Sequence, residues 1–484
     1  MIVGDLMKRQ RVALFLIAAC LVVLTSCSGL PRQNTGGGGN SSLSVTMTDT
    51  PPAGVTILSF KFTLTGFTVT PSTGTPVALI SGSNPVTVEL TQLQADATPL
   101  GTFTIPSNTY KSINVTVANA DISFANQSGA AIGQCPNATV CEIQPAGIGN
   151  LTVSTAPFPI TVSSGGNIGL SLDFNLANAI TSTVGVDFTQ PNVLTAASLP
   201  ISNQPTGQFE PIPDVVGVVQ TVNATAQTFS LQSTRGTFAV SASTNTLFDN
   251  FLSCAAGNFT CLQNNMVVSA DLTLNSNGTF TATEIEFEDT APDDEITGVV
   301  FSIDATTQTN FTIVVLDKLE SASGSLIGAV SVGNLATVQL ASSPSFVVDT
   351  KGLVVPQSPL SLFQGSSNTS QMLGGQVVQV RVKTFTAASP PANASLTTDR
   401  VRLRFSVLSA PVSLAGNPNF NLGPLSPLLA NQSLLSLQVQ TQLKTAFEGV
   451  TDVSGLAGGD NVSVRGLFFN GTPAIVVAAK VRKH

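Results

Sequence analysis

The sequence has no tryptophan, one tyrosine and one histidine among its 484 residues, and only 10% of its residues are charged. The histidine is His484, the last residue, so the chain has little with which to build a Ser-His-Asp triad, a histidine-rich metal site or a histidine acid-base group. The formal net charge of −8 argues against a protein that binds nucleic acid through its charge. Because no cofactor motif stands out either, we predict a non-catalytic protein with no cofactor and no nucleic-acid partner.

Apolar residues are plentiful by contrast, at 42% of the chain, which is too many for a disordered protein. Near the N-terminus they form the uninterrupted stretch 12–24, which follows the basic residues Lys8, Arg9 and Arg11. This order is typical of a secretory signal, and 13 apolar residues are fewer than the roughly 20 that a membrane-spanning helix needs.

The apolar stretch ends in Leu24-Thr25-Ser26-Cys27, which resembles a bacterial lipobox. That resemblance implies cleavage before Cys27 and lipidation of its thiol, and several acyl chains anchor a protein firmly where one binds marginally. Ser28 follows, where an aspartate would favour retention at the inner membrane, so the resemblance implies the outer membrane. The membrane is thus an expected partner, reached through the N-terminal lipid anchor.

The cysteines agree with export. Cys20 lies in the signal and Cys27 is the lipidation site, so four cysteines remain as two local pairs. An even number of cysteines in an exported chain indicates disulfides. We predict that each local pair closes a small loop: Cys135 with Cys141, and Cys254 with Cys261.

Most of the chain after Ser42 alternates apolar residues with Thr, Ser or Lys, which is the pattern of half-buried β-strands. Glycine and proline interrupt it at short intervals, and only 91–97 and 425–437 suit short helices, the second with Ser426 before Pro427 as its first residue. The expected fold is all-β, with an N-terminal β-sandwich followed by about three small β-barrel-like repeat units.

The N-terminal part carries short motifs. It opens with LSVTMTDTPPAGV (43–55) and closes with IGLSLDFNLANAI (168–180) and VDFTQPNVL (186–194). This part resembles the domain-of-unknown-function family 4382, found in exported bacterial lipoproteins, although Asn175 stands where an acid is common. The resemblance implies a β-sandwich and no established reaction.

Beyond a Pro-rich linker the sequence repeats itself. Each copy has a Gly-containing strand, a Phe-centred strand, a turn, a strand of the form GxxVxV and a closing strand, as in 216–222, 228–232, 236–240 and 281–287 of the first copy. The copies resemble the domain-of-unknown-function family 5666. The expected organisation is a lipoprotein signal peptide (1–26), a flexible Gly-rich tether (27–42), a β-sandwich (43–200), a linker (201–214) and three β repeats (215–290, 295–406 and 407–484).

Two acidic places are candidates for calcium. Asp49 precedes a Thr-Pro-Pro turn and could bind Ca²⁺ with Asp173, although a turn aspartate commonly accepts backbone N–H groups instead. The stretch 284–295 has seven carboxylates in twelve residues. Its alternating glutamates at 284, 286 and 288 favour a solvated strand face, with Asp293, Asp294 and Glu295 in a linker between repeats. We therefore predict no metal site and keep these acids as weak candidates.

These observations favour a lipid-anchored protein of the bacterial cell envelope whose β-domains present loops to an envelope protein, a glycan or another extracellular partner. Sugar binding usually uses Trp or Tyr, and the chain offers only Tyr110, while its 27 phenylalanines suit core positions. Two alternatives stay open. One is a calcium-stabilised adhesin or polysaccharide-binding surface protein, and the other is an envelope hydrolase that uses Asp and Glu alone.

Overall fold

A computed structural model describes residues 40–484 except 51–55, 84, 96–97, 127–128, 145–148, 181–186, 200–211, 234–235, 252–253, 276–278, 322–323, 390–391 and 431. The expected signal peptide, Cys27 and the tether up to residue 39 lie outside these residues. Asn40–His484 form one unit with its own contacts. No helix within the described residues is long and apolar enough to cross a membrane.

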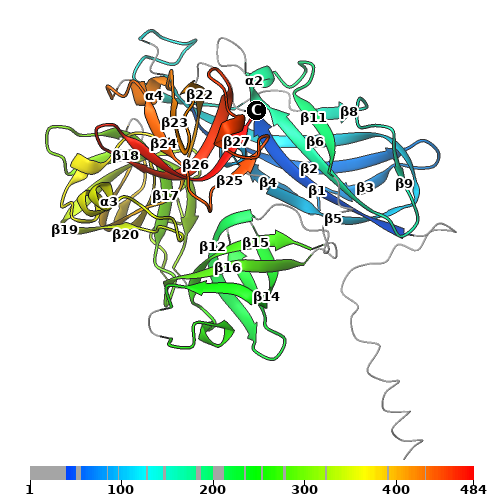
Figure 1. The fold of residues 1–484 in the computed structure, drawn as a ribbon, viewed down its shortest axis with the longest axis horizontal. Coiled ribbons are helices and arrows are strands. Elements are labelled where there is room, and N and C mark those ends of the chain that lie inside the picture. The colour runs from blue at the N-terminus through cyan, green and yellow to red at the C-terminus, as the bar shows by residue number, and fades with distance from the viewer. Residues whose placement is uncertain are drawn as a thin grey trace, which may run out of the picture. The chain divides into compact units, whose positions relative to one another are not determined.

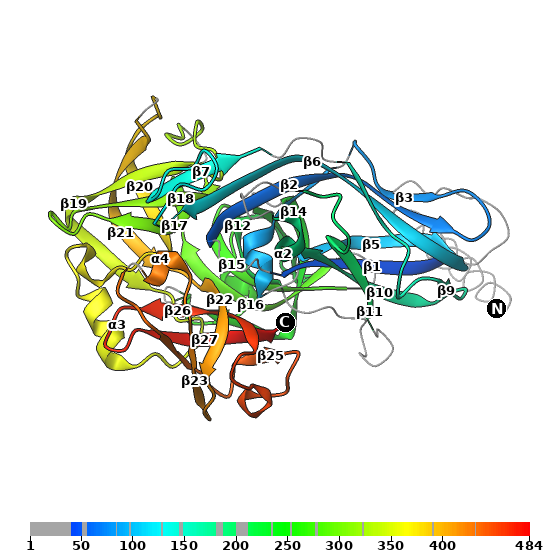
Figure 2. The same cartoon turned by 90° about the horizontal axis from the view of Figure 1, so that it is seen from above.

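The N-terminal part consists of two β-sheets. The first has the order β11-β10-β1-β5 and is made of β1 (Asn40–Thr50), β5 (Thr98–Pro106), β10 (Asn167–Asn175) and β11 (Leu194–Leu199). The second has the order β3-β2-β6-β7 with β4, β8 and β9 paired to its long strands, and is made of β2 (Thr56–Pro71), β3 (Val77–Ile80), β4 (Val86–Glu89), β6 (Asn108–Asn126), β7 (Thr139–Ile143), β8 (Asn150–Val153) and β9 (Ile160–Val162). Figure 2 shows β2 and β6 running side by side along this sheet. A 3-10 helix η1 (Leu90–Gln94) and a short helix α2 (Leu176–Ala179) complete it.

The sandwich core follows from the alternation in its strands. Phe60, Phe62 and Leu64 occupy every second position of β2 and are fully buried. They meet Phe174 of β10, whose ring centre lies 5.2 Å from that of Phe62. The predicted sandwich is therefore confirmed, and its phenylalanines lie in the core as expected.

Two five-stranded closed barrels follow. Barrel 1 comprises β12 (Ile212–Asn223), β13 (Thr228–Ser233), β14 (Gly236–Asp249), β15 (Val267–Leu274) and β16 (Phe280–Asp289), drawn in green in Figure 1. Barrel 2 comprises β17 (Glu295–Ile303), β18 (Asn310–Leu319), β19 (Leu335–Val348), β20 (Val377–Thr386) and β21 (Ala394–Leu403). Both first strands carry a glycine at a close backbone approach. A Cβ on Gly298 would lie 2.7 Å from the carbonyl oxygen of Val314, so a side chain there meets backbone.

The third repeat has the same plan with one strand divided in two. Its strands are β22 (Ser406–Leu414), β23 (Asn419–Leu422), β24 (Leu437–Gln440), β25 (Ala446–Glu448), β26 (Asn461–Phe469) and β27 (Ile475–Lys483). They form a sheet of order β24-β23-β22-β26-β27-β25, and a parallel pairing of β24 with β27 closes the ring. We call this unit barrel 3. The predicted barrel-like repeats are thus present.

All three barrels share an irregularity in the third strand, which pairs in parallel with the closing strand. In barrel 1, Ala242 and Leu247 are five positions apart, but their partners Ala282 and Glu284 are two apart, which leaves an excess of 5 − 2 = 3 residues. The same excess occurs in barrel 2 (5 − 2) and in barrel 3 (6 − 3). It fixes which residues of the three closing strands are equivalent: Glu284 of β16, Arg400 of β21 and Lys480 of β27.

Short helices depart in part from the expectation. The segment 91–97 gives η1, and the segment 425–437 gives α4 (Pro427–Ala430), which begins at Pro427 as predicted. Sequence reasoning missed α3 (Gln357–Gln364), which lies in an insertion of barrel 2. Phe363 explains it, because this buried side chain packs against Phe346 and Phe469, at ring-centre distances of 5.4 and 6.4 Å. Each barrel also has a 3-10 turn before its fourth strand: η2 (Phe259–Cys261), η3 (Thr369–Gln371) and η4 (Val453–Gly455).

Candidate functional site

The closing strands of barrels 1 and 2 carry opposite charges at equivalent positions. Strand β16 places glutamates at 284, 286 and 288, and β21 with the residue after it places arginines at 400, 402 and 404. Because alternate residues of a strand share one face, each strand presents a row of like charges. The two rows meet.

The meeting point is an interbarrel ion-pair cluster. It consists of Asp214, Glu286 and Glu288 from barrel 1, Asp349, Lys351, Arg402 and Arg404 from barrel 2, and Arg465 from barrel 3. These residues come from all three barrels, so the cluster joins them through side chains that are buried or nearly so.

Glu288 lies between two arginines. Its Oε1 is 2.7 Å from Nη1 of Arg404, and its Oε2 contacts Arg402. Arg404 also reaches Asp349 at 3.3 Å. Burial and the neighbouring Arg404 lower the pKa of Arg402 to about 10, so it still carries its charge at neutral pH.

Lys351 lies among three carboxylates. Its Nζ is 3.2 Å from Asp214 and 3.4 Å from Asp349, and it contacts Glu286. Burial disfavours its charge, but Asp214 and Asp349 outweigh burial and keep the pKa of Lys351 above its ordinary value. Burial likewise works against the charge of Asp214, yet Lys351, Arg465 and Arg404 hold its pKa well below the usual range.

Glu286 behaves differently from its neighbours. Burial raises its pKa to about 8, and Asp349 adds to the rise against the opposing effect of Lys351. The four acids and four bases of the cluster would cancel if all were ionised. The raised pKa of Glu286 favours its protonated form at neutral pH, which shifts the balance of the cluster towards positive charge.

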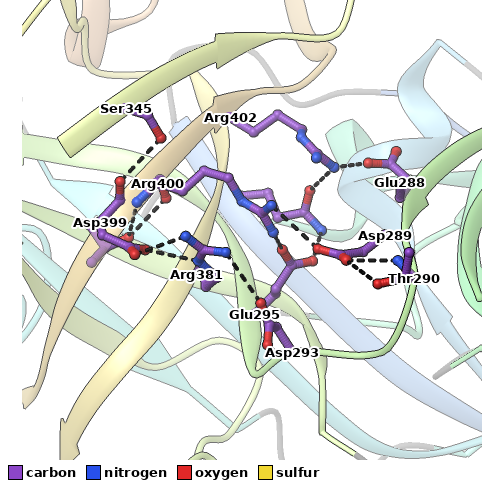
Figure 3. Close-up of polar contacts among 12 residues, drawn as sticks. Glu288, Asp289, Thr290, Asp293, Glu295, Ser345, Arg381, Asp399, Arg400 and Arg402 are labelled. Carbon is purple, nitrogen blue, oxygen red and sulfur yellow. Dashed lines mark hydrogen bonds and ion pairs between the residues drawn. The ribbon is translucent and has the colours of Figure 1, made fainter. Parts of the chain in front are cut away.

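A second group of pairs continues along β20 and β21 (Figure 3). Arg381 binds Asp399 through two hydrogen bonds of 2.8 Å and lies 3.5 Å from Asp293. Arg400 contacts Glu295 and lies 3.5 Å from Asp289. These arginines reach acids at the end of β16 and the start of β17, where the chain passes from barrel 1 to barrel 2.

The proposed calcium candidates have protein partners here. Asp294 accepts the backbone N–H groups of Ser321 and Leu326 at 2.8 and 2.6 Å. Asp293 pairs with Arg381, and Glu295 with Arg400. The three neighbouring carboxylates therefore serve three different parts of barrel 2.

The other candidate pair is not brought together by the pairing register. Thr48 pairs with Asp173 and Asp49 with Phe174, so the two aspartates are offset by one position on neighbouring strands. Asp173 is half-buried. The side chain of Asp49 lies outside the described part of the chain.

One expectation was wrong: the alternating glutamates do not form a solvated strand face. Glu286 is buried, and the side chain of Glu288 is 4% exposed. The arginines of barrel 2 cover this face and supply the charge that allows carboxylates to be buried. Oxygens of Glu286, Glu288 and Asp349 lie within 4.8 Å of one another, but Lys351 and Arg404 already bind this group.

A second site is a cavity of about 420 Å³ where the sandwich meets barrels 2 and 3. The start of β2 and η1 line it from the sandwich, β17, β18 and the start of β20 from barrel 2, and β22 with the α4 region from barrel 3. Its walls are mainly apolar, as in Leu58, Val299 and Leu428. We call it the junction cavity.

A chain of hydrogen bonds lies at one side of the junction cavity. Oγ of Ser409 donates to Oε1 of Gln94 at 2.9 Å and lies 2.6 Å from Oγ of Ser463, which is 2.7 Å from Nε2 of His484. Gln94, Ser409 and His484 line the cavity, and Ser463 is buried behind them.

The direction of this chain follows from counting protons. A hydroxyl has one proton, and that of Ser409 goes to Gln94, so Ser463 donates to Ser409 and His484 donates from Nε2 to Ser463. Burial, helped by Arg482, lowers the pKa of His484 to about 4, so the ring is neutral at physiological pH and Nε2 carries its one proton. A base that activates a serine must accept its proton, whereas His484 donates here.

Asp121 is another carboxyl group with a raised pKa, as acid catalysis requires. Burial and the neighbouring Glu142 raise the pKa of Asp121 to about 6. The two side chains interact directly, whereas the carboxyls of glycosidases lie about 5–9.5 Å apart. Asp121 and Glu142 therefore lack the separation that glycoside hydrolysis needs.

The remaining predicted residues fall into place. Disulfides join Cys135 to Cys141 and Cys254 to Cys261, so both predicted pairs are confirmed. Tyr110 is 3% exposed and donates its hydroxyl to the carbonyl of Pro106, so it offers no face for a sugar ring.

Sequence reasoning missed both junctions. The alternation of arginines at 400, 402 and 404 was a visible signal, since it mirrors the glutamates of the preceding repeat with the opposite sign. The junction cavity had no such signal, because Gln94 and Ser409 are 315 positions apart.

Residues 40–196 match the model of a family described as Domain of unknown function (DUF4382). The match covers the N-terminal sandwich, so the resemblance seen in its motifs is confirmed for this part of the chain. No curated protein matches the chain.

Proposed function

We propose that this chain is a lipid-anchored protein of the bacterial cell envelope, placed at the outer membrane, which acts as a non-catalytic structural or binding module. The observation that carries the proposal is the order of basic residues, a short apolar stretch and Leu24-Thr25-Ser26-Cys27. The membrane is then one partner, and an envelope protein or a glycan is the other.

The architecture supports a scaffold role. In the two described ion-pair groups, acids of barrel 1 and of the link to barrel 2 bind bases of barrel 2, so these charges serve to hold repeats together. The five-stranded plan of the barrels supports our proposal that they are members of the domain-of-unknown-function family 5666. A sandwich and three barrels behind a proposed tether that ends before β1 suit the presentation of loops to a partner.

Labelling with an alkyne analogue of palmitate tests the anchor. We expect the wild-type protein to take up the label and Cys27→Ala to lose it, because only Cys27 follows the lipobox residues. Cys20→Ala is the matched control and should keep the label, since Cys20 lies within the apolar stretch. Label that persists in Cys27→Ala, or an unlabelled wild type, would refute the lipoprotein assignment.

Protease treatment of intact cells then separates the two directions in which a partner could lie. Digestion of the anchored protein places the partner outside the cell, and protection places it in the periplasm.

A calcium-stabilised adhesin remains the alternative, supported by the group of Glu286, Glu288 and Asp349. It requires that EDTA lower the melting temperature of the purified protein. Lys351 and Arg404 already bind these carboxylates, which favours an unchanged melting temperature on addition of EDTA.

A further inference from the structure

The junction cavity has the size and the walls of a small-molecule site. Its volume of about 420 Å³ falls within the roughly 300–1,000 Å³ typical of ligand pockets. The sandwich and barrels 2 and 3 all contribute to it, and the contacting side chains Leu58, Val314 and Leu428 form a small core of their own beside it.

The cavity favours an uncharged ligand. None of the described residues that line it is Lys, Arg, Asp or Glu. The ring of His484 is the one titratable side chain among them, and it is neutral at physiological pH because burial lowers its pKa to about 4. An anion placed among these walls would lose its hydration and find no charged side chain of opposite sign.

The polar side of the cavity favours a ligand that donates a hydrogen bond. Ser409 already uses its proton on Gln94, and one lone pair of its oxygen accepts from Ser463. A hydroxyl oxygen has a second lone pair, and Ser409 lines the cavity. This lone pair can accept a hydrogen bond from an O–H or N–H group of a ligand, and an alcohol is the simplest uncharged molecule that supplies one.

From this geometry we propose that the junction cavity binds an uncharged, largely apolar alcohol, with its hydroxyl donating to Oγ of Ser409 and its hydrocarbon part against the apolar walls. The site goes beyond the proposed envelope role. It lies wholly within Asn40–His484 and does not depend on Cys27. A negative ligand test would therefore refute this site alone, and a negative palmitate test would refute the lipoprotein assignment alone.

The experiment uses the chain from Ser28 onward, exported so that the disulfides form and carrying no histidine tag. It retains the whole of Asn40–His484, within which all the described contacts lie. The chain has one histidine and one tyrosine, so each gives a single NMR probe. His484 lines the cavity, and Tyr110, buried in the sandwich, does not.

Three ligands of similar size are titrated at pH 7.5: 1-octanol, its isomer 1-methoxyheptane and octanoate. We expect 1-octanol to shift the His484 ring signal saturably with Tyr110 unchanged. The ether cannot donate a hydrogen bond, so it should bind roughly two- to ten-fold more weakly. Octanoate should bind more than roughly ten-fold more weakly.

Two variants sharpen the result. Ser409→Ala should make the alcohol and the ether bind equally, and Val407→Phe, which enlarges a cavity-lining side chain on the Ser409 face of β22, should abolish both shifts. If either variant fails to fold, the three-ligand comparison on the wild type still decides.

The proposal is overturned if 1-octanol gives no saturable shift of His484 up to its solubility limit, or if it moves Tyr110 equally. It is also overturned if octanoate binds as tightly as the alcohol, or if the ether does.

Discussion

The ion-pair cluster and the junction cavity contain equivalent positions of the repeated barrel. Four residues after Glu284, Arg400 and Lys480 come Glu288, Arg404 and His484. In barrels 1 and 2 this position is charged, and the two charges bind each other at 2.7 Å. In barrel 3 it is a neutral histidine that faces a cavity.

The comparison teaches that one barrel plan supports two kinds of junction. Opposite charges at one position make a specific contact, because neither partner can be buried alone. In barrel 3 the same position carries a neutral residue beside a cavity that apolar side chains line. The barrel plan is the same at both junctions, and the side chains it presents differ.

The largest expected loss of stability comes from breaking the interbarrel ion-pair cluster. Glu288→Gln leaves Arg402 and Arg404 without the carboxylate they share. We therefore expect the free energy of unfolding, measured by urea denaturation, to fall by about 3–5 kcal/mol. Glu320→Gln is the matched control. Its pair with Lys318 is exposed and should contribute less than about 1 kcal/mol. Equal effects of the two variants would mean that the cluster has no special role.

Disrupting the walls of the junction cavity should lower the free energy of unfolding by a smaller amount. Leu428→Ala removes a buried side chain beside an existing cavity, whose walls can relax, so the loss should lie at the lower end of about 2–5 kcal/mol. Leu435→Ala changes a residue that is 89% exposed and should leave the free energy of unfolding unchanged. A loss from Leu428→Ala larger than that from Glu288→Gln would reverse the order of the two junctions.

The junctions should also respond to pH in opposite directions, and Glu286 governs the first. Its pKa in the folded protein, about 8, lies above the ordinary 4.5, so its stabilising contribution is complete below pH 4.5 and is lost as the pH rises towards 8. Glu286→Gln mimics the protonated form. Its stability relative to the wild type should therefore increase across this window, by less than about 1.4 kcal/mol per pH unit. A constant difference between pH 4.5 and 8 would contradict the raised pKa.

His484 should give the smallest effect, with the opposite sign. Its pKa in the folded protein, about 4, lies below the ordinary 6.5, so its contribution is present above pH 6.5 and is lost as the pH falls towards 4. In His484→Gln this acid-side loss should disappear. Titration of the His484 ring signal by NMR measures the pKa directly, and a value near 6.5 would remove the basis for a neutral cavity.

The sequence predicted the fold class well because its information is local. Alternation in β2 and β16 specifies strands, and cysteines six or seven positions apart specify small disulfide loops. Helix α3 was missed because a turn of helix in an insertion depends on Phe363 reaching an aromatic pair from other strands.

The sites depended on contacts that no local pattern contains. The alternating glutamates were assigned to solvent because alternation identifies a face and not what covers it. Their cover comes from Arg402 and Arg404, more than a hundred residues away. His484 was set aside for want of partners in sequence, and the fold supplies Ser463 and Ser409.

Closure of the barrels has a consequence for solubility. Every strand of barrels 1 and 2 has a partner on both sides, so neither barrel offers a strand edge to which another chain could add. Among the described strands, β5 and β11 each pair on one side only, at the two ends of the first sheet of the sandwich. Strands β3 and β7 at the two ends of the second sheet are edges as well. Aggregation by strand addition would therefore begin outside barrels 1 and 2, and charged residues introduced along such edge strands are changes that would oppose it.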